Sequence, residues 1–283
     1  MGESMLTREQ IEQVVQMALA EDAPWGDITS ETLVPAAAVA NADLVARESG
    51  VLSGGEVFAI AMTTLDDTVK VTLHVADGEH FDKGAVLASV SGPARIVLRA
   101  ERVALNLVQR MTGIATLTAA YVAAVDGTKA RVVDTRKTTP GLRALERHAV
   151  RSGGGHNHRF SLSDAVMAKD NHLAVIDDLT AALKQSRKDL PHTMHIEVEV
   201  DRLEQLDAVL AAGVDTIMLD NFSLGDLRRG IEIIGDQALV EASGGITLDT
   251  IADIARTGVD VISVGALTHS VRALDLGLDI TVR

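Results

Sequence analysis

The chain has 283 residues, of which 47% are hydrophobic and 23% charged, and it contains no cysteine. The hydrophobic fraction excludes a disordered chain, no apolar run reaches the ~20 residues that span a bilayer, and without cysteine there is no disulfide or thiolate chemistry. A formal net charge of −14 with only 2% aromatic residues argues against nucleic-acid binding. The first residues lack the basic and apolar segments of a secretion signal, so we expect a soluble cytoplasmic protein.

The first third of the chain mixes helix and strand patterns. Residues 7–20 place apolar side chains at helical spacing, with Thr7 as a plausible N-cap. Short β-like runs, separated by glycines, follow at residues 42–47, 69–75 and 86–90. Residues 95–125 predict one long helix that begins after Pro93 and continues past a single glycine, Gly113. Four of its arginines fall near one face: Arg95, Arg99, Arg102 and Arg110.

From about residue 130, short apolar strands alternate with amphipathic helices. The strands are predicted at residues 131–134, 165–168, 196–200, 216–219, 239–242 and 261–264. The helices are predicted at residues 178–188, 203–212, 224–234 and 248–256, with Asp201, Ser223 and Thr247 at N-cap positions. This repetition predicts a parallel sheet, either doubly wound or wound as a barrel.

Each of these strands is followed by polar residues or glycine. Polar residues are ordinary in loops, but in β/α barrels the loops after the strands also form the active site. Because the pattern repeats from strand to strand, it favours one shared site. The groups concerned are Asp134 to Lys137, Lys169 to His172, Glu199, Asp220 and Asn221, Ser243 to Gly245, and Gly265.

Basic residues gather between residues 129 and 159 in an otherwise acidic chain, opposed there only by Asp134 and Glu146. They are Lys129, Arg131, Arg136, Lys137, Arg143, Arg147, Arg151 and Arg159. Two interpretations stay open on charge alone. One is a positive pocket for a small anion, and the other is the exposed basic face of a helix.

Glycine loops after the last two strands, SGG at 243–245 and VGA at 264–266, are typical of a phosphate site in a barrel. Arginine side chains match carboxylates and phosphates. Glu199 and Asp220, at neighbouring strand ends, predict a Mg²⁺ site or stabilisation of a developing positive charge. His158 could also do no more than satisfy a loop backbone, but the glycines before it leave room for a ligand.

The sequence contains no pattern for a protein nucleophile or a paired-histidine zinc site. Cysteine is absent, Ser243 has no G-x-S-x-G context, and no H-E-x-x-H occurs. The segment around Lys83 is similar to the hairpin of biotinyl and lipoyl carrier domains, but an ordinary turn with Gly84 at a positive φ is the favoured interpretation.

These motifs together resemble the quinolinate phosphoribosyltransferase family. The matching stretches run through nearly the whole chain in order, and DTRKTTPGLR and GGGHNHR are the most specific. They are LAEDAPWGDIT (19–29), ERVALNLVQRMTGIAT (101–116), DTRKTTPGLR (134–143), GGGHNHR (153–159), KDNH (169–172), EVEV (197–200), LDN (219–221), EASGGI (241–246) and GVDVISVGALTHS (258–270). The chain departs from the family pattern at Ser161 and Ala168, which should affect packing and not the charged groups.

The resemblance implies an α/β fold in two domains. An N-terminal α/β sandwich would cover residues 1–112 and an incomplete β/α barrel residues 113–266, with the tail, 267–283, packing back on the sandwich. It also implies a homodimer with shared active sites, in which Arg102 reaches the partner's barrel.

The reaction implied by the resemblance converts quinolinate and phosphoribosyl pyrophosphate to nicotinate mononucleotide, pyrophosphate and CO₂. Lys137, Lys169, Glu199 and Asp220 would be the catalytic residues, and Glu199 and Asp220 would also hold Mg²⁺, directly or indirectly. The residues implied in substrate binding are Arg102, Thr135, Arg136, Lys137, His158, Arg159, Lys169, Glu199, Asp220, Ser243, Gly244, Gly245, Val264, Gly265, Ala266 and His269. Two alternatives remain: a non-catalytic dicarboxylate sensor, and a phosphoribosyltransferase or pyrophosphorylase for another ligand, such as nicotinate or a molybdenum-related compound.

Overall fold

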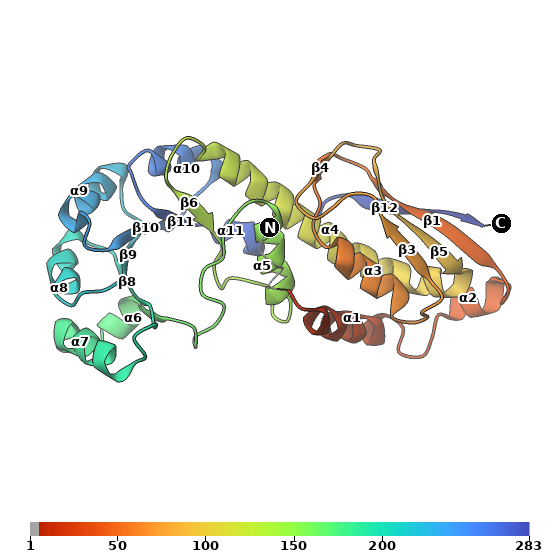
Figure 1. Ribbon diagram of the computed structural model, residues 1–283, viewed down its shortest axis with the longest axis horizontal. Helices are drawn as coiled ribbons and strands as arrows, with labels where there is room; N and C mark the ends of the chain where they lie inside the picture. The colour runs from red at the N-terminus through yellow and green to blue at the C-terminus, as the bar shows by residue number, and fades with distance from the viewer. Residues whose placement is uncertain (1–5, 283) are drawn as a thin grey trace. The chain divides into compact units, whose positions relative to one another are not determined.

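The computed structural model describes residues 6–282, which form two compact units (Figure 1). The first unit contains the residues through Ala119, then Thr138–Gly154 and the residues from Leu267 onward. The second unit contains Ala120–Lys137 and Gly155–Ala266. The domain boundary at residue 112 stays a prediction from the sequence. None of the helices formed by residues 6–282 has the length and apolar character that crossing a membrane requires.

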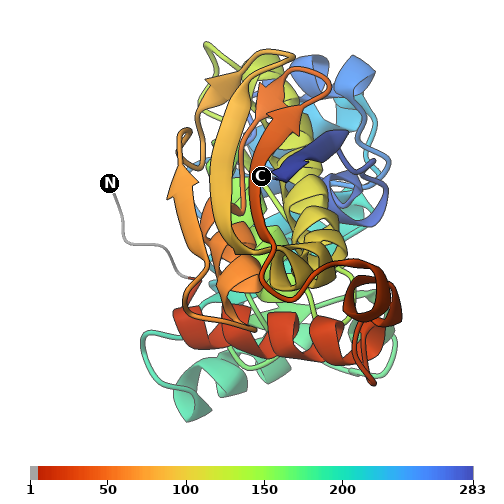
Figure 2. The same cartoon turned by 90° about the vertical axis from the view of Figure 1, so that its right-hand side faces the viewer.

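The first unit is built on an antiparallel sheet of four strands in the order β12-β1-β5-β3. These strands are β1 (Val39–Ala46), β3 (Lys70–Leu73), β5 (Val86–Pro93) and β12 (Leu276–Val282). β12 pairs with β1 although the two are far apart in the chain, as Figure 2 shows. Along β1, side chains alternate between buried and more exposed positions, which is the pattern of a strand with one face on the core.

The rest of this unit consists of helices and two short strands. They are α1 (Arg8–Asp22), α2 (Ile28–Leu33), β2 (Gly50–Val51), α3 (Gly55–Thr63), β4 (His80–Phe81) and α5 (Arg143–Ser152), with most of α4 (Ala94–Ala124) and of α11 (Ala266–His269). β2 and β4 pair with each other, and α1 packs against α3.

Helices α1 and α4 confirm their sequence predictions to within two residues. Thr7 caps α1: its hydroxyl accepts from the N–H of Gln10 at 3.3 Å, and the Gln10 side chain accepts from the N–H of Thr7 at 3.0 Å. Gly113 lies inside α4 because the chain passes close by there. A Cβ at Gly113 would lie 2.2 Å from the carbonyl oxygen of Arg272, so any larger residue would push that segment away.

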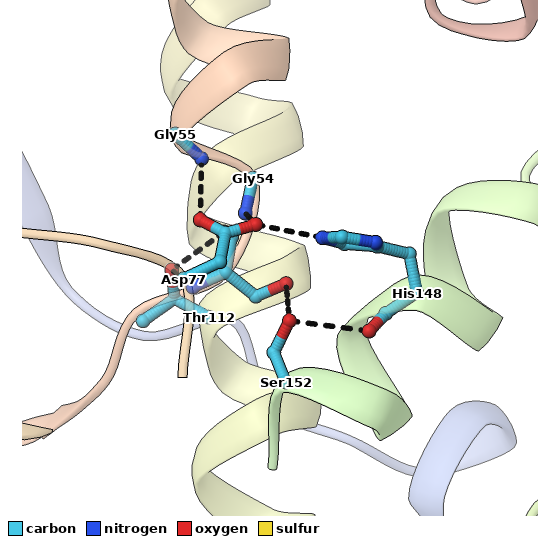
Figure 3. Close-up of polar contacts among 7 residues, drawn as sticks. Gly54, Gly55, Asp77, Thr112, His148 and Ser152 are labelled. Atoms are coloured by element: carbon cyan, nitrogen blue, oxygen red, sulfur yellow. Dashed lines mark hydrogen bonds and ion pairs between the residues drawn. The ribbon is translucent and has the colours of Figure 1, made fainter. Parts of the chain in front are cut away.

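Asp77 joins three segments of the first unit (Figure 3). Its carboxylate accepts from the backbone N–H groups of Gly54 and Gly55, each at 2.9 Å, at the start of α3. Its Oδ2 also lies 2.7 Å from Nε2 of His148 on α5. Burial alone would raise the pKa of Asp77, but the hydrogen bonds from His148, Gly54 and Gly55 lower it. Asp77 therefore caps α3 and holds α5 beside it.

The second unit is a parallel sheet of six strands in the order β6-β11-β10-β9-β8-β7. The strands are β6 (Arg131–Val133), β7 (Val166–Ala168), β8 (Ile196–Val200), β9 (Thr216–Asp220), β10 (Leu239–Ser243) and β11 (Val261–Ser263). Helices α6 (Asp170–Leu173), α7 (Leu179–Asp189), α8 (Leu206–Leu210), α9 (Leu224–Ile234) and α10 (Leu248–Ala255), with the 3₁₀ turn η1 (Leu203–Gln205), occur between the strands, and α8 to α10 lie outside them in Figure 1.

The strand order decides between the two predicted windings. From β7 to β11 each strand pairs with the next one in the chain, without the reversal of a doubly wound sheet. β6 then pairs with β11, the last strand, so the sheet winds as a barrel. β6 and β7 form its two edges, so the barrel is incomplete. The predicted α/β fold class is confirmed.

The predicted N-cap at Asp201 is wrong. Arg202 holds that position before η1, and the Gln205 side chain accepts from the N–H groups of both Asp201 and Arg202. The N-caps at Ser223 and Thr247 are confirmed, and the hydroxyl of Ser223 accepts from the N–H of Asp226 at 3.1 Å. An aspartate directly after a strand therefore does not always mark the start of a helix. Here the Gln205 side chain accepts from the backbone N–H groups of the residues that precede the helix.

Candidate active site

A cavity of about 400 Å³ lies in the second unit at the carboxyl ends of the barrel strands. Every described strand of the barrel supplies it, directly or through the loop that follows. Its lining residues are Thr135, Arg136, Lys137, His158, Arg159, Met167, Lys169, Glu199, Met218, Asp220, Ser243 and Ser263. The cavity therefore stands where a barrel enzyme carries its active site.

Most of the residues predicted for the site from the second unit line this one cavity. The glycine-loop residues Gly244, Gly245, Val264, Gly265 and Ala266 do not, but they directly follow the lining residues Ser243 and Ser263. Arg102 and His269 belong to the first unit, where Arg102 is exposed on α4. Their predicted roles stay predictions.

Three lining residues are absent from the sequence prediction: Met167, Met218 and Ser263. In the sequence, Met167 and Met218 look like ordinary strand residues. Side chains two positions apart on a strand share a face, so Met218 could have been placed beside the site from Asp220, two residues further along β9. The alternation of side chains along β9 was therefore the sequence signal available for Met218.

Both interpretations of the basic cluster hold in part. Arg136, Lys137 and Arg159 line the cavity. Arg143, Arg147 and Arg151 belong to α5 in the first unit, where Arg147 is buried and Arg151 is exposed. Some residues of the basic cluster therefore line the cavity, and others belong to a helix.

Asp134 organises the loop that carries His158 and Arg159. Its side chain is fully buried and accepts from the N–H of His158 at 2.8 Å and from Nδ2 of Asn157 at 2.5 Å. His156 forms a parallel bridge to Val133, beside the end of β6. From the sequence, Asp134 was placed among the polar groups at the strand ends but was given no role, and the structure shows that it positions the loop that carries His158.

Arg136 and Arg159 bring two guanidinium groups to one part of the cavity wall. Burial and the nearby charge of Arg136 lower the pKa of Arg159. Nη1 of Arg159 donates to the carbonyl oxygen of Ala165 at 2.9 Å, which fixes the side chain. Two half-buried guanidinium groups near each other favour an anionic ligand, because an anion relieves their mutual repulsion.

His158 is held by two buried carboxylates. Its Nε2 lies 3.2 Å from Oε2 of Glu197 and 3.5 Å from Oε2 of Glu241. Burial lowers the pKa of His158, but the hydrogen bonds and charges of these two carboxylates more than offset it and raise the pKa to about 10. Burial also raises the pKa of Glu197. His158 therefore does more than satisfy a loop backbone.

Lys169 and Glu199 face each other across the cavity wall. Nζ of Lys169 donates to Oε2 of Glu199 at 2.6 Å, and the Glu199 side chain is 14% exposed. The pair joins the residue after β7 to the end of β8. A cation and an anion therefore lie together in the wall of the cavity.

Asp220 is fixed by the turn that follows it. Its Oδ2 accepts from Nδ2 of Asn221 at 2.7 Å, and Asn221 is the one non-glycine residue among 6–282 with a positive φ. A Cβ on Gly244 would lie 2.3 Å from Oδ1 of Asn221. Gly244, predicted only as part of a phosphate loop, is thus also required for this close approach.

The carboxylates of Glu199 and Asp220 fit a Mg²⁺ ion by their donor chemistry. Mg²⁺ is held in proteins by one or two carboxylates together with water and substrate phosphates. Glu199 and Asp220 supply two carboxylates to one cavity from neighbouring strands. One oxygen of Glu199 already accepts from Lys169, so Glu199 would hold the ion through its other oxygen or indirectly.

The barrel and its cavity define a class of protein: a β/α-barrel enzyme whose cationic site takes an anionic substrate. Comparison with known families then narrows the class. Residues 27–112 match the quinolinate phosphoribosyl transferase N-terminal domain, and residues 114–279 match the C-terminal domain of the same family. The chain belongs to the quinolinate phosphoribosyltransferase family.

Individual relatives agree along the whole chain. A probable nicotinate-nucleotide pyrophosphorylase [carboxylating] of Bacillus subtilis is 42% identical over 96% of this chain and 94% of its own length. The corresponding protein of Mycobacterium leprae is 47% identical over 94% of this chain and 95% of its own. The crystal structure of NadC from Streptococcus pyogenes superposes with a TM-score of 0.95 at 40% identity, over 99% of this chain and 100% of the other.

Proposed function

We propose that this chain catalyses phosphoribosyl transfer from phosphoribosyl pyrophosphate to quinolinate with decarboxylation, which yields nicotinate mononucleotide, pyrophosphate and CO₂ for de novo NAD biosynthesis. Its relatives are named for this activity, both as nicotinate-nucleotide pyrophosphorylase [carboxylating] and as quinolinate phosphoribosyltransferase [decarboxylating]. The observation that carries the proposal is one cavity with five cationic groups and two carboxylates. The cations are Arg136, Lys137, His158, Arg159 and Lys169, and the acids are Glu199 and Asp220.

The cations suit a dicarboxylate substrate. Arg136 and Arg159 provide guanidinium groups that can fork two carboxylates, and His158 and Lys169 add charge in the same cavity. Because quinolinate carries two carboxylates and nicotinate only one, this charge favours quinolinate. Lys137, exposed at the cavity, would reach the phosphoribosyl donor.

Glu199 and Asp220 would act on the ribose. Loss of pyrophosphate makes C1 of the ribose resemble an oxocarbenium ion, and two fixed carboxylates nearby stabilise that charge. A Mg²⁺ ion held by the same residues would offset the negative charge of the pyrophosphate. The pyridine nitrogen then attacks C1, with the ring held in place by the arginine and lysine contacts.

Decarboxylation follows from the chemistry of the substrate itself. Once the ring nitrogen is alkylated, its positive charge stabilises the electron pair that stays on C2 when the 2-carboxylate leaves as CO₂, and C2 then takes up a proton from water. The protein must bind and orient the two substrates. No protein nucleophile is required, which suits a sequence without cysteine.

The remaining assignments are parts of this proposal. The loops 243–245 and 264–266 would bind the 5′-phosphate, with backbone N–H groups supplied by the glycines, and His269 stays a predicted substrate-binding residue. Arg102 would enter the site of a second copy of the chain, so the enzyme would be a homodimer with shared sites. We place it in the cytoplasm.

Product analysis tests the proposed substrate. The purified protein is incubated with phosphoribosyl pyrophosphate, Mg²⁺ and either quinolinate or nicotinate, and mononucleotide and pyrophosphate are measured. We expect both products with quinolinate and little with nicotinate. Equal turnover of nicotinate would overturn the substrate assignment, and binding of quinolinate without products would favour a sensor.

A further inference from the structure

Two acidic side chains lie inside the barrel, one layer below the cavity. Side chains two residues apart on a strand share a face, so Glu197 lies beneath Glu199 on β8, and Glu241 lies beneath Ser243 on β10. Glu199 and Ser243 line the cavity, but Glu197 and Glu241 do not. Both are buried, each with 3% of its surface exposed.

Buried carboxylates are costly unless a cation or hydrogen bonds compensate them. Oε1 of Glu197 and Oε1 of Glu241 have no hydrogen-bond partner among the described residues. Oε2 of each faces Nε2 of His158, at 3.2 and 3.5 Å. The imidazole is therefore the cation that both carboxylates share, and its ring is also part of the cavity wall.

We propose that Glu197 and Glu241 are positioning residues for His158, which hold its ring as a cation in the cavity wall and so complete the positive charge that binds a dianionic substrate. The two acids would not contact the substrate. They would act through His158 alone.

The charges around His158 favour the protonated, cationic form of its ring. Glu197 and Glu241 face Nε2 from β8 and β10, and Asp134 accepts from the backbone N–H of His158 at the end of β6. The two glutamates raise its pKa to about 10 against the effect of burial. The other ionisable groups of the cavity are Arg136, Lys137, Arg159, Lys169, Glu199 and Asp220.

One contact opposes the protonated form of His158. The N–H of Arg159 points at Nδ1 of His158 at 2.7 Å, and this hydrogen bond requires a lone pair on Nδ1. Two buried carboxylates facing the ring outweigh one hydrogen bond to a neutral acceptor. We therefore expect the imidazolium form at neutral pH, with the Arg159 contact made only by the neutral ring.

A titration tests the charge directly. The chain is labelled with ¹⁵N-histidine, and the signal of His158, identified by its loss in His158→Gln, is followed from pH 6 to pH 10. We expect imidazolium shifts up to about pH 9, because the pKa lies near 10. In Glu241→Gln and in Glu197→Gln the midpoint should fall by at least about one unit. A midpoint near 6.5 in the unmodified protein would overturn the proposal.

Kinetics tests the consequence for substrate binding, and this part rests on the proposed function. In Glu241→Gln, KM for quinolinate should rise about threefold at pH 9.5, between the two midpoints, and stay nearly unchanged at pH 6, where His158 is protonated in both proteins. kcat should change less than KM. Glu232→Gln, an exposed acid on α9, is the matched control and should match the unmodified protein.

A double variant separates this role from a general structural one. If Glu241 acts through His158, adding Glu241→Gln to His158→Gln should change KM by less than about twofold. Full additivity of the two effects would contradict the proposal. The titration needs no substrate, so a protein that fails to turn over quinolinate would count against the proposed function and leave the charge of His158 measurable.

Discussion

Replacement of Arg136 should weaken substrate binding without lowering the stability of the fold. It lines the cavity at a strand end and contributes little to the core. Arg136→Ala should therefore weaken quinolinate binding by about 2–5 kcal/mol, the cost of removing one partner of a buried charge pair, with an unchanged unfolding midpoint. Calorimetry measures the affinity, and Arg256→Ala, at an exposed arginine directly after α10, is the control. Unchanged affinity would remove Arg136 from the site.

Asp220 should matter for turnover more than for quinolinate binding. Its proposed partners are Mg²⁺ and the ribose, so Asp220→Asn should lower kcat strongly while leaving the dissociation constant of quinolinate nearly unchanged. Activity should also require Mg²⁺ or Mn²⁺ and disappear with a chelator. If Asp220→Asn affects only the apparent quinolinate affinity, the carboxylate has been assigned to the wrong substrate.

Site residues near the strand ends were predicted from the sequence. The two glutamates one layer below the cavity were not. Glu199 and Asp220 lie at the ends of their strands and Arg136 in the loop just after β6, where position alone indicates a site. Glu197 and Glu241 lie in the middle of apolar strands, and only the three-dimensional contact with His158 gives them a role. The available signal was an acid at two-residue spacing from a predicted site residue.

At the scale of elements, the barrel strands were predictable because each is a short apolar run bounded by polar residues. β8 and α9 match their predicted bounds, Ile196–Val200 and Leu224–Ile234. Helix α3 was not predicted because it is apolar almost throughout, and α5 was predicted only as one of two interpretations of the basic cluster. Helix α3 shows no apolar stripe, and in α5 the buried apolar positions Leu145, Ala149 and Val150 are interspersed with charged residues. The contacts of Asp77 that hold both helices are visible only in the structure.

The Asp77 cap predicts a pH-dependent contribution to stability. The folded-state pKa of Asp77 is lowered, so its stabilisation is fully present above the unfolded-state value of about 4 and is lost as pH falls through the folded value. Asp77→Ala leaves the N–H groups of Gly54 and Gly55 without their acceptor and should cost about 1–3 kcal/mol at pH 7.

Urea unfolding at pH 7 and at pH 3.5 measures this contribution. We expect the difference between Asp77→Ala and the unmodified protein to be smaller at the lower pH. Asp67→Ala, an exposed aspartate in the same unit, should change stability by no more than about 0.5 kcal/mol. A difference that stays constant, or grows, as pH falls would show that Asp77 does not act through its charge.

At the scale of the whole molecule, Arg102 carries the proposal of a shared site. It is exposed on α4, where replacement of a solvated residue normally changes stability by no more than about 0.5 kcal/mol. If Arg102 enters a partner's barrel, Arg102→Ala and Arg136→Ala subunits should each be inactive alone. In a mixed dimer one site carries both defects and the other carries neither, so activity should return towards half of the unmodified level. No recovery despite proven subunit exchange would exclude sharing through Arg102.

The proposed function requires that one cavity both joins ribose to quinolinate and removes the 2-carboxylate. Isotope labelling follows both events at once: quinolinate labelled at the 2-carboxylate carbon is incubated with the protein, phosphoribosyl pyrophosphate and Mg²⁺. We expect labelled CO₂ in an amount equal to the nicotinate mononucleotide formed, with none released when phosphoribosyl pyrophosphate is left out and almost none with Arg136→Ala. Label retained in the mononucleotide, or CO₂ released without the ribose donor, would contradict the proposed function.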